Sequence, residues 1–199
     1  GKLGNIDRLY AAGFRMMGLQ HFFDNRLGGS LHGESQTGLT AFGEEAVRTM
    51  HARGIMIDVA HSSEATVRDT LRVTGGSALI VSHTGFNGHC PSPRNISDET
   101  MAMITESGGL IGVGFWSDVV CGASINAIVS AIRYGIDRFG LEHIVLGSDW
   151  DGSVTTPIDA SQLPHLTQAL LDADFTEQQV AAVMGGNMAR FLDDHLPPQ

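Results

Sequence analysis

Short apolar runs alternate with amphipathic segments along most of the chain. Five short runs have the length of buried strands, four of them with Ile and Val, and segments with helical periodicity separate them. The runs cover 15–21, 54–61, 78–83, 109–116 and 143–149; the helical segments cover 3–13, 39–52, 63–73, 97–107, 124–139, 160–173 and 177–194. Strands that alternate with helices predict a parallel sheet with right-handed crossovers.

Metal-capable side chains end three of these runs, namely His61, His83 and Asp149. In an α/β barrel, residues at the carboxyl ends of the strands face one shared pocket. Five strand–helix units are too few to close eight strands, so two architectures remain open. The chain forms either a small open sheet or the C-terminal five-eighths of a (β/α)8 barrel of the TIM type, and the three strand-end residues favour the barrel.

The two histidines are separated by 22 residues, which is one strand–helix–strand step. One buried histidine could equally be a hydrogen-bonded core residue, but two at equivalent positions of adjacent units favour metal ligation by His61 and His83. Asp149 follows an apolar strand and is expected to bind metal or to act as a base. Asp151 precedes a glycine, and we expect it to be a turn residue.

Two further side chains are candidates for substrate contacts. His21 ends the first run and could be a metal ligand or a donor to a carbonyl oxygen. Arg94 lies in a stiff Pro-Ser-Pro-Arg loop, where its guanidinium suits a substrate carboxylate. The remaining histidines are expected to be structural or exposed, and Phe115 and Trp116 are expected in the core, with pocket lining as the alternative. These histidines are His32, His51, His89, His143, His165 and His195.

Length and charge restrict the class of partner. The chain has 199 residues, 42% of them hydrophobic, which is enough for one domain spanning 1–199. A net charge of −10, with one lysine against eleven arginines, argues against nucleic acid and anionic membrane surfaces as partners. No apolar run approaches the roughly 20 residues of a membrane span, so no membrane-spanning segment is expected.

Five segments, in this order and spacing, resemble the renal (membrane) dipeptidase family of zinc metallopeptidases. They are Gly38-Leu-Thr-Ala-Phe-Gly, Ile57-Asp-Val-Ala-His-Ser, Val81-Ser-His-Thr, Pro93-Arg-Asn and Gly147-Ser-Asp-Trp-Asp-Gly. The resemblance covers essentially the whole chain. It implies a (β/α)8 barrel that holds two zinc ions and hydrolyses the peptide bond of dipeptides, a small-molecule substrate.

The resemblance also implies roles for single residues. His61 and His83 would bind one zinc ion, while Asp149 would bind the other and transfer a proton. His21 would contact the scissile carbonyl and its developing oxyanion, and Arg94 would bind the substrate carboxylate. Cys90 and Cys121 match a disulfide of the animal enzymes. That disulfide would favour a periplasmic or secreted protein over a cytoplasmic one, although the compartment stays open.

Two elements of the family's metal site are not found in the sequence. The family has a His-x-Asp pair on its first barrel strand and a glutamate that bridges the two metals, and no His-x-Asp occurs here. We therefore expect these residues to form the C-terminal portion of such an enzyme, with weak zinc binding and little activity alone. Unpaired strand edges of a partial barrel would also invite homo-oligomers.

Two alternatives remain open. The first is another binuclear-metal amidohydrolase of the same barrel type. Many of those enzymes bridge their metals with a carboxylated lysine on a strand, whereas the one lysine here, Lys2, precedes the first helix. The second is a non-catalytic remnant of the fold that acts as a binding module.

Overall fold

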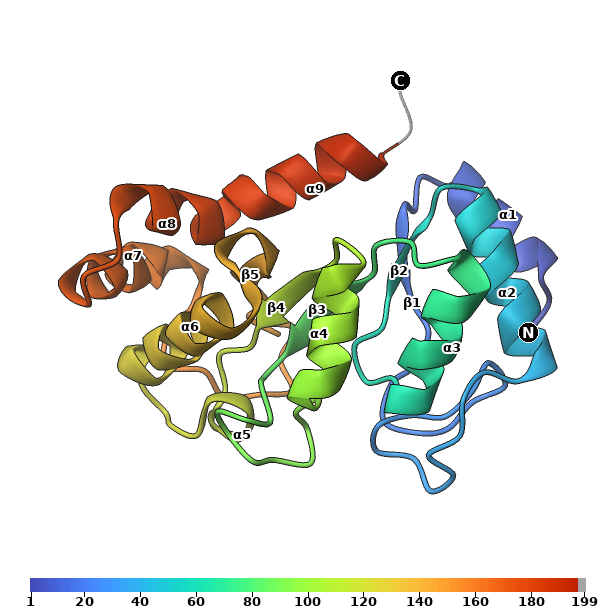
Figure 1. Ribbon diagram of the computed structural model, residues 1–199, viewed down its shortest axis with the longest axis horizontal. Helices are drawn as coiled ribbons and strands as arrows, with labels where there is room; N and C mark the ends of the chain where they lie inside the picture. The colour runs from blue at the N-terminus through green and yellow to red at the C-terminus, as the bar shows by residue number, and fades with distance from the viewer. Residues whose placement is uncertain (197–199) are drawn as a thin grey trace.

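A computed structural model describes residues 1–196 (Figure 1). Its strands are β1 (Met16–Gly18), β2 (Met56–Asp58), β3 (Ile80–Thr84), β4 (Leu110–Val113) and β5 (Ile144–Leu146). Its α-helices are α1 (Gly4–Ala11), α2 (Ala41–Ala52), α3 (Glu64–Thr74), α4 (Asp98–Glu106), α5 (Ser117–Val120), α6 (Ile125–Phe139), α7 (Leu163–Asp172), α8 (Glu177–Ala181) and α9 (Asn187–His195). Short 3-10 turns η1 (Leu141–His143) and η2 (Ala160–Gln162) and a π-helical turn η3 (Ala182–Gly186) complete the list.

The five strands form one parallel sheet in the order β1-β2-β3-β4-β5. The parallel arrangement predicted from the sequence is confirmed. A doubly wound sheet reverses its strand order at a switch point, whereas here every strand pairs with its neighbour in the sequence. This order is that of a barrel wall, and it brings all carboxyl ends of the strands to one edge.

Helices cover one face of the sheet, and α9 covers part of the other (Figure 1). Side chains from α2, α3, α4 and α6 join strand residues such as Ile57 and Ile111 in the main core. A smaller core forms where Phe191 of α9 meets residues at or near the amino ends of four strands, namely Met56, Ile80, Leu110 and Val145. Because α9 packs at the amino ends, the opposite edge of the sheet is left for the site.

The strands are shorter than predicted, and this changes the setting of three candidate residues. His21, His61 and Asp149 each lie three residues beyond the end of their strand. His61 and Asp149 have φ of 62° and 61°. Left-handed turns therefore stand where the sequence predicted the last residues of these strands. Of the predicted site residues, only His83 lies within a strand. The predicted helix 177–194 is also divided, because Gly185 (φ 162°, ψ −22°) leaves the helical conformation between α8 and α9.

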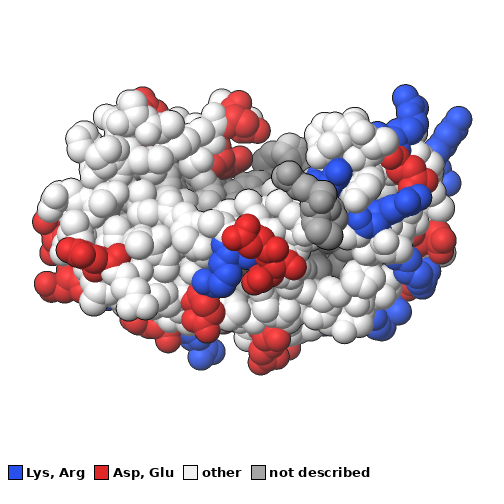
Figure 2. Space-filling view, turned by 90° about the horizontal axis from the view of Figure 1, so that it is seen from above, with Lys and Arg blue, Asp and Glu red and all other residues white. Residues whose placement is uncertain are grey.

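Charge is distributed unevenly between the two halves of the chain. Residues 1–72 hold eight basic and eight acidic side chains, whereas residues 73–199 hold four basic and fourteen acidic ones. Figure 2 shows most of the visible basic side chains on the side of α1–α3, with a few among acidic side chains elsewhere. Within residues 1–196, none of the helices has the length and apolar character needed to cross a bilayer.

Candidate active site

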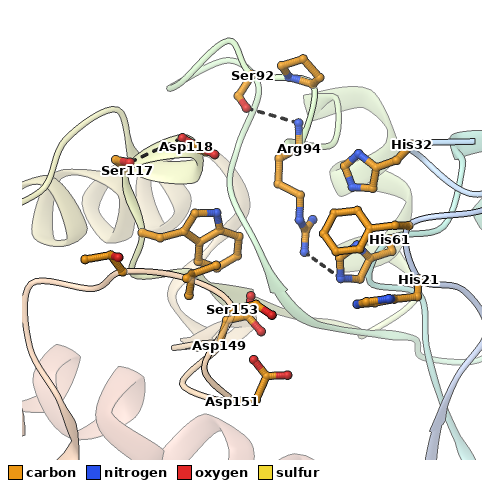
Figure 3. Close-up of a pocket in the computed structure, with 15 residues that line it drawn as sticks. His21, His32, His61, Ser92, Arg94, Ser117, Asp118, Asp149, Asp151 and Ser153 are labelled. Atoms are coloured by element: carbon orange, nitrogen blue, oxygen red, sulfur yellow. Dashed lines mark hydrogen bonds between the residues drawn. The ribbon is translucent and has the colours of Figure 1, made fainter.

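A cavity of about 620 Å³ opens at the carboxyl edge of the sheet. Four of the residues that line it were predicted from the sequence as site residues, namely His21, His61, Arg94 and Asp149. Figure 3 shows His21, His32 and His61 on one side and the two aspartates, Asp149 and Asp151, on the other. The remaining lining residues are Phe22, Ser92, Pro93, Trp116, Ser117, Asp118, Ser153, Val154 and Thr155.

The imidazoles of His61 and His83 face each other, with their Nε2 atoms 2.9 Å apart. Asp58, at the end of β2, fixes this arrangement because its Oδ1 accepts the backbone N–H groups of Ala60 and Ser82, both at 3.0 Å. The Ser82 hydroxyl in turn lies 2.8 Å from His83 Nδ1. One carboxylate thereby joins the turn after β2, which carries His61, to strand β3, which carries His83, and helps to set the separation of the two rings.

Both imidazoles are held in the neutral form. Burial lowers the pKa of His61 to about 3, and the nearby charge of Arg94 contributes to this shift. Burial and Arg94 also lower the pKa of His83, although Asp149 opposes the shift. Since a metal ion binds neutral imidazole, the environment keeps both side chains in the state that ligation requires.

Arg94 is 8% exposed and lies beside the histidine pair. Its NH2 group donates to the His83 carbonyl at 3.1 Å and lies 3.4 Å from His61 Nε2. Its NH1 atom is buried without a hydrogen-bond partner among residues 1–196. Burial lowers the pKa of Arg94 to about 10, so the side chain remains a cation at neutral pH with donors left for an anionic ligand.

The loop that carries Arg94 is fastened to the opposite rim of the cavity. A disulfide joins Cys90 to Cys121, as the family resemblance implied, with the Cα atoms 5.5 Å apart. The Asn95 amide also donates to the carbonyls of Cys90 and Val119, at 2.8 and 3.0 Å. These bonds fix the position of the guanidinium relative to the segment that holds Trp116.

The acidic side of the cavity comes from the turn after β5. Asp149 Oδ1 lies 3.8 Å from His83 Nε2, so the carboxylate is close to the histidine pair. Asp151 lies in a turn, as predicted, and also lines the cavity, which the sequence interpretation did not anticipate. A ligand with a negative and a positive end could therefore contact Arg94 and these carboxylates at the same time.

His32 was expected to be structural or exposed, and the structure places it at the cavity. It lines the cavity, and its Nε2 is buried without a partner among residues 1–196. Burial and the charge of Arg94 lower its pKa. Trp116 lines the cavity while only 6% exposed, whereas Phe115 is fully buried in the core. The loop 22–37 has no periodicity from which the position of His32 could have been predicted.

The histidine pair fits two ligands of one metal ion. Because a Zn–N bond is about 2.0–2.1 Å long, one ion can bind two nitrogens that lie up to about 4 Å apart, and 2.9 Å is within that limit. In the described part of the chain, no group of three or more His, Cys, Asp or Glu side chains is arranged to hold a metal. The metal-ligand roles of His61, His83 and Asp149 therefore stay predictions.

The sequence model of the membrane dipeptidase family, peptidase family M19, matches residues 1–195. The chain belongs to this family. The protein in the pqqA 5' region of Klebsiella pneumoniae is 30% identical over 208 residues, covering 96% of this chain and 76% of its own length. Dipeptidase aclJ of Aspergillus oryzae is 31% identical over 205 residues, covering 98% of this chain and 48% of its own length.

A solved structure supports the same assignment. A metallopeptidase from Rhodobacter sphaeroides, liganded with a phosphinate mimic of the dipeptide L-Ala-D-Ala, superimposes with a TM-score of 0.84 at 26% identity. The match covers 96% of this chain and 58% of that one. The predicted family and barrel-type fold class are confirmed, and the chain spans about half the length of the Aspergillus dipeptidase. Membership in a family with dipeptidase and metallopeptidase members supports a hydrolase activity.

Proposed function

We propose that this protein hydrolyses the peptide bond of dipeptides with the help of zinc. One observation carries the proposal. His61 Nε2 lies 2.9 Å from His83 Nε2, and beside this pair the cavity is lined by Arg94, whose buried NH1 has no hydrogen-bond partner among residues 1–196. A metal-binding pair and an anion-binding group at this spacing suit a small substrate that ends in a carboxylate.

In this proposal, His61 and His83 would hold one zinc ion, and Asp149 would be a ligand of a second. Zinc supplies Lewis acidity and lowers the pKa of a bound water molecule into the neutral range. The low pKa of His61 supports this role, because the imidazole stays neutral and does not compete for protons. A carboxylate as close as 3.8 Å to His83 Nε2 is suitably placed to accept a proton.

The remaining roles belong to substrate positioning. Arg94 NH1 binds the terminal carboxylate through a charge-assisted hydrogen bond. His21 donates a hydrogen bond to the oxygen of the scissile carbonyl as negative charge develops there. Asp149 accepts the proton that the attacking water molecule loses as its oxygen bonds to the carbonyl carbon, and passes that proton to the nitrogen of the leaving amine as the C–N bond breaks. A dipeptide with a D-residue at its C-terminal position is a reasonable substrate, since the Rhodobacter relative binds a mimic of L-Ala-D-Ala.

The test uses the protein as it is isolated from its own cells. It measures the zinc content of this protein and its rate of L-Ala-D-Ala hydrolysis. Asp149→Asn is expected to reduce kcat at least about 100-fold, because the proton acceptor is lost. Asp174→Asn is a matched control, since Asp174 has the same φ of 61° but does not line the cavity. A zinc-loaded wild-type protein that hydrolyses no dipeptide would contradict the proposal and favour a non-catalytic binding module.

A further inference from the structure

The loop 22–37 holds the backbone around His32 firmly. The Asp24 carboxylate accepts the backbone N–H of Ser30 at 2.8 Å, and the Ser30 hydroxyl accepts that of His32 at 3.2 Å. The Gln36 amide donates to the carbonyls of residues 30, 31 and 33. The loop is therefore ordered by internal hydrogen bonds, and these bonds fix the backbone that carries His32.

The His32 imidazole packs against neighbouring rings but leaves its Nε2 atom without a hydrogen bond among residues 1–196. Its ring lies 5.2 Å from the Phe22 ring and 5.5 Å from the His61 ring, measured between centroids. Its buried Nε2 has no hydrogen-bond partner among the residues that the structure describes. Because a buried polar atom without a partner costs folding free energy, a nitrogen held in this way indicates a bound group that is contacted in function.

The neighbour of His32 indicates the charge of that group. Arg94 lines the same cavity on a separate loop, and its NH1 donor is also buried without a partner in residues 1–196, as is Nδ1 of the neighbouring His61. Figure 3 shows His32 next to the Arg94 side chain, away from Asp149 and Asp151. A group that meets both a guanidinium and an imidazole N–H is negatively charged, whereas an ammonium would go to the acidic side.

We propose that His32 binds the carboxylate of the substrate's C-terminal residue together with Arg94. This inference rests on the proposed dipeptidase function. His32 is a substrate-binding residue here, and neither a metal ligand nor a proton donor to the scissile bond. The two donors come from loops that follow different strands, so they meet the carboxylate from two directions and fix its orientation.

The test compares glycylglycine with its C-terminal amide, which lacks the charged carboxylate. Calorimetric affinity and steady-state kinetics are measured for the wild type, His32→Phe and His32→Gln, with the exposed His165→Gln as control. His32→Phe keeps the ring shape but cannot donate, so its affinity for glycylglycine is expected to fall about tenfold, with KM rising and kcat nearly unchanged. Binding of the amide should change little, and His32→Gln should restore most of the preference for the acid.

The outcomes separate this inference from the proposed function. If dipeptides are hydrolysed and His32→Phe binds both ligands as the wild type does, the role of His32 is refuted while the dipeptidase function stands. If no dipeptide is hydrolysed but His32→Phe loses the preference for the acid, the carboxylate site stands and the hydrolase assignment fails. Loss of zinc from His32→Phe would make His32 a metal ligand and overturn the inference.

Discussion

Arg94 holds a position that is unfavourable for folding and that, under the proposed function, serves substrate binding. The residue is 8% exposed, its NH1 has no partner among residues 1–196, and burial lowers its pKa to about 10. Removing a buried, incompletely paired charge is often neutral or stabilising. At this scale the structure therefore predicts opposite effects of one substitution on stability and on substrate binding.

Arg94→Met is expected to raise the free energy of unfolding by about 1 kcal/mol, and hence Tm by about 2–4 °C. The same variant should lower kcat/KM for dipeptides about 100-fold, because the charge-assisted bond to the carboxylate is lost. Thermal unfolding and a dipeptide assay check both effects. The exposed Arg68, which pairs with Glu64 at 3.7 Å, provides Arg68→Met as a control with little change in either measurement. A lower Tm for Arg94→Met would contradict the prediction.

At the scale of elements, two glycines let the strands approach closely under the histidine pair. A Cβ atom on Gly112 of β4 or on Gly147 after β5 would overlap the backbone carbonyl oxygen of Ser82. Because Ser82 precedes His83, the absence of these side chains sets how deeply His83 sits between its neighbours. Backbone atoms cannot move aside as a flexible side chain can, so strands β3 and β4 would have to separate.

Gly112→Ala is expected to lower the free energy of unfolding by about 2–3 kcal/mol through overpacking. Gly4→Ala is the matched control, since a Cβ on Gly4 in α1 meets nothing within 4 Å. That variant should be neutral or slightly stabilising, because alanine favours a helix more than glycine does. Urea unfolding measures the free energy of unfolding of both variants. Equal stability of Gly112→Ala and the wild type would show that the sheet can adjust at this point.

At the scale of the whole molecule, the cavity is built from segments far apart in the sequence and depends on one covalent link. The Cys90–Cys121 disulfide spans 31 residues and joins the Arg94 loop to the segment of Trp116. Cys90→Ser with Cys121→Ser should therefore lower the free energy of unfolding by about 3 kcal/mol and raise KM for dipeptides.

The chain has only two cysteines, so a reducing agent acts on this bond alone. The Tm of the wild type should be lower with reductant than without it, whereas the Tm of the double variant should be the same in both conditions. Coincidence in the wild type would show that the link contributes nothing to stability. The compartment in which the disulfide forms remains a prediction, as does the number of zinc ions.

The sequence by itself determined the local structure and most of the candidate site. Alternating apolar and amphipathic segments fixed five strands and their helices, because burial of one face dictates periodicity. The same runs ended near His21, His61, His83 and Asp149, and a stiff loop held Arg94. The family resemblance added the disulfide. These features depend on neighbours in the chain, which a sequence displays directly.

Only the tertiary structure decided how these residues meet. The Nε2 atoms of His61 and His83 lie 2.9 Å apart because hydrogen bonds to the Asp58 carboxylate connect the two segments that carry these residues. The position of His32 in the cavity results from contacts of an aperiodic loop. No spacing rule predicts such contacts, because they form between segments that come together only when the sheet assembles. Periodicity reports which face of an element is buried, whereas the geometry of a site depends on the packing of many elements at once.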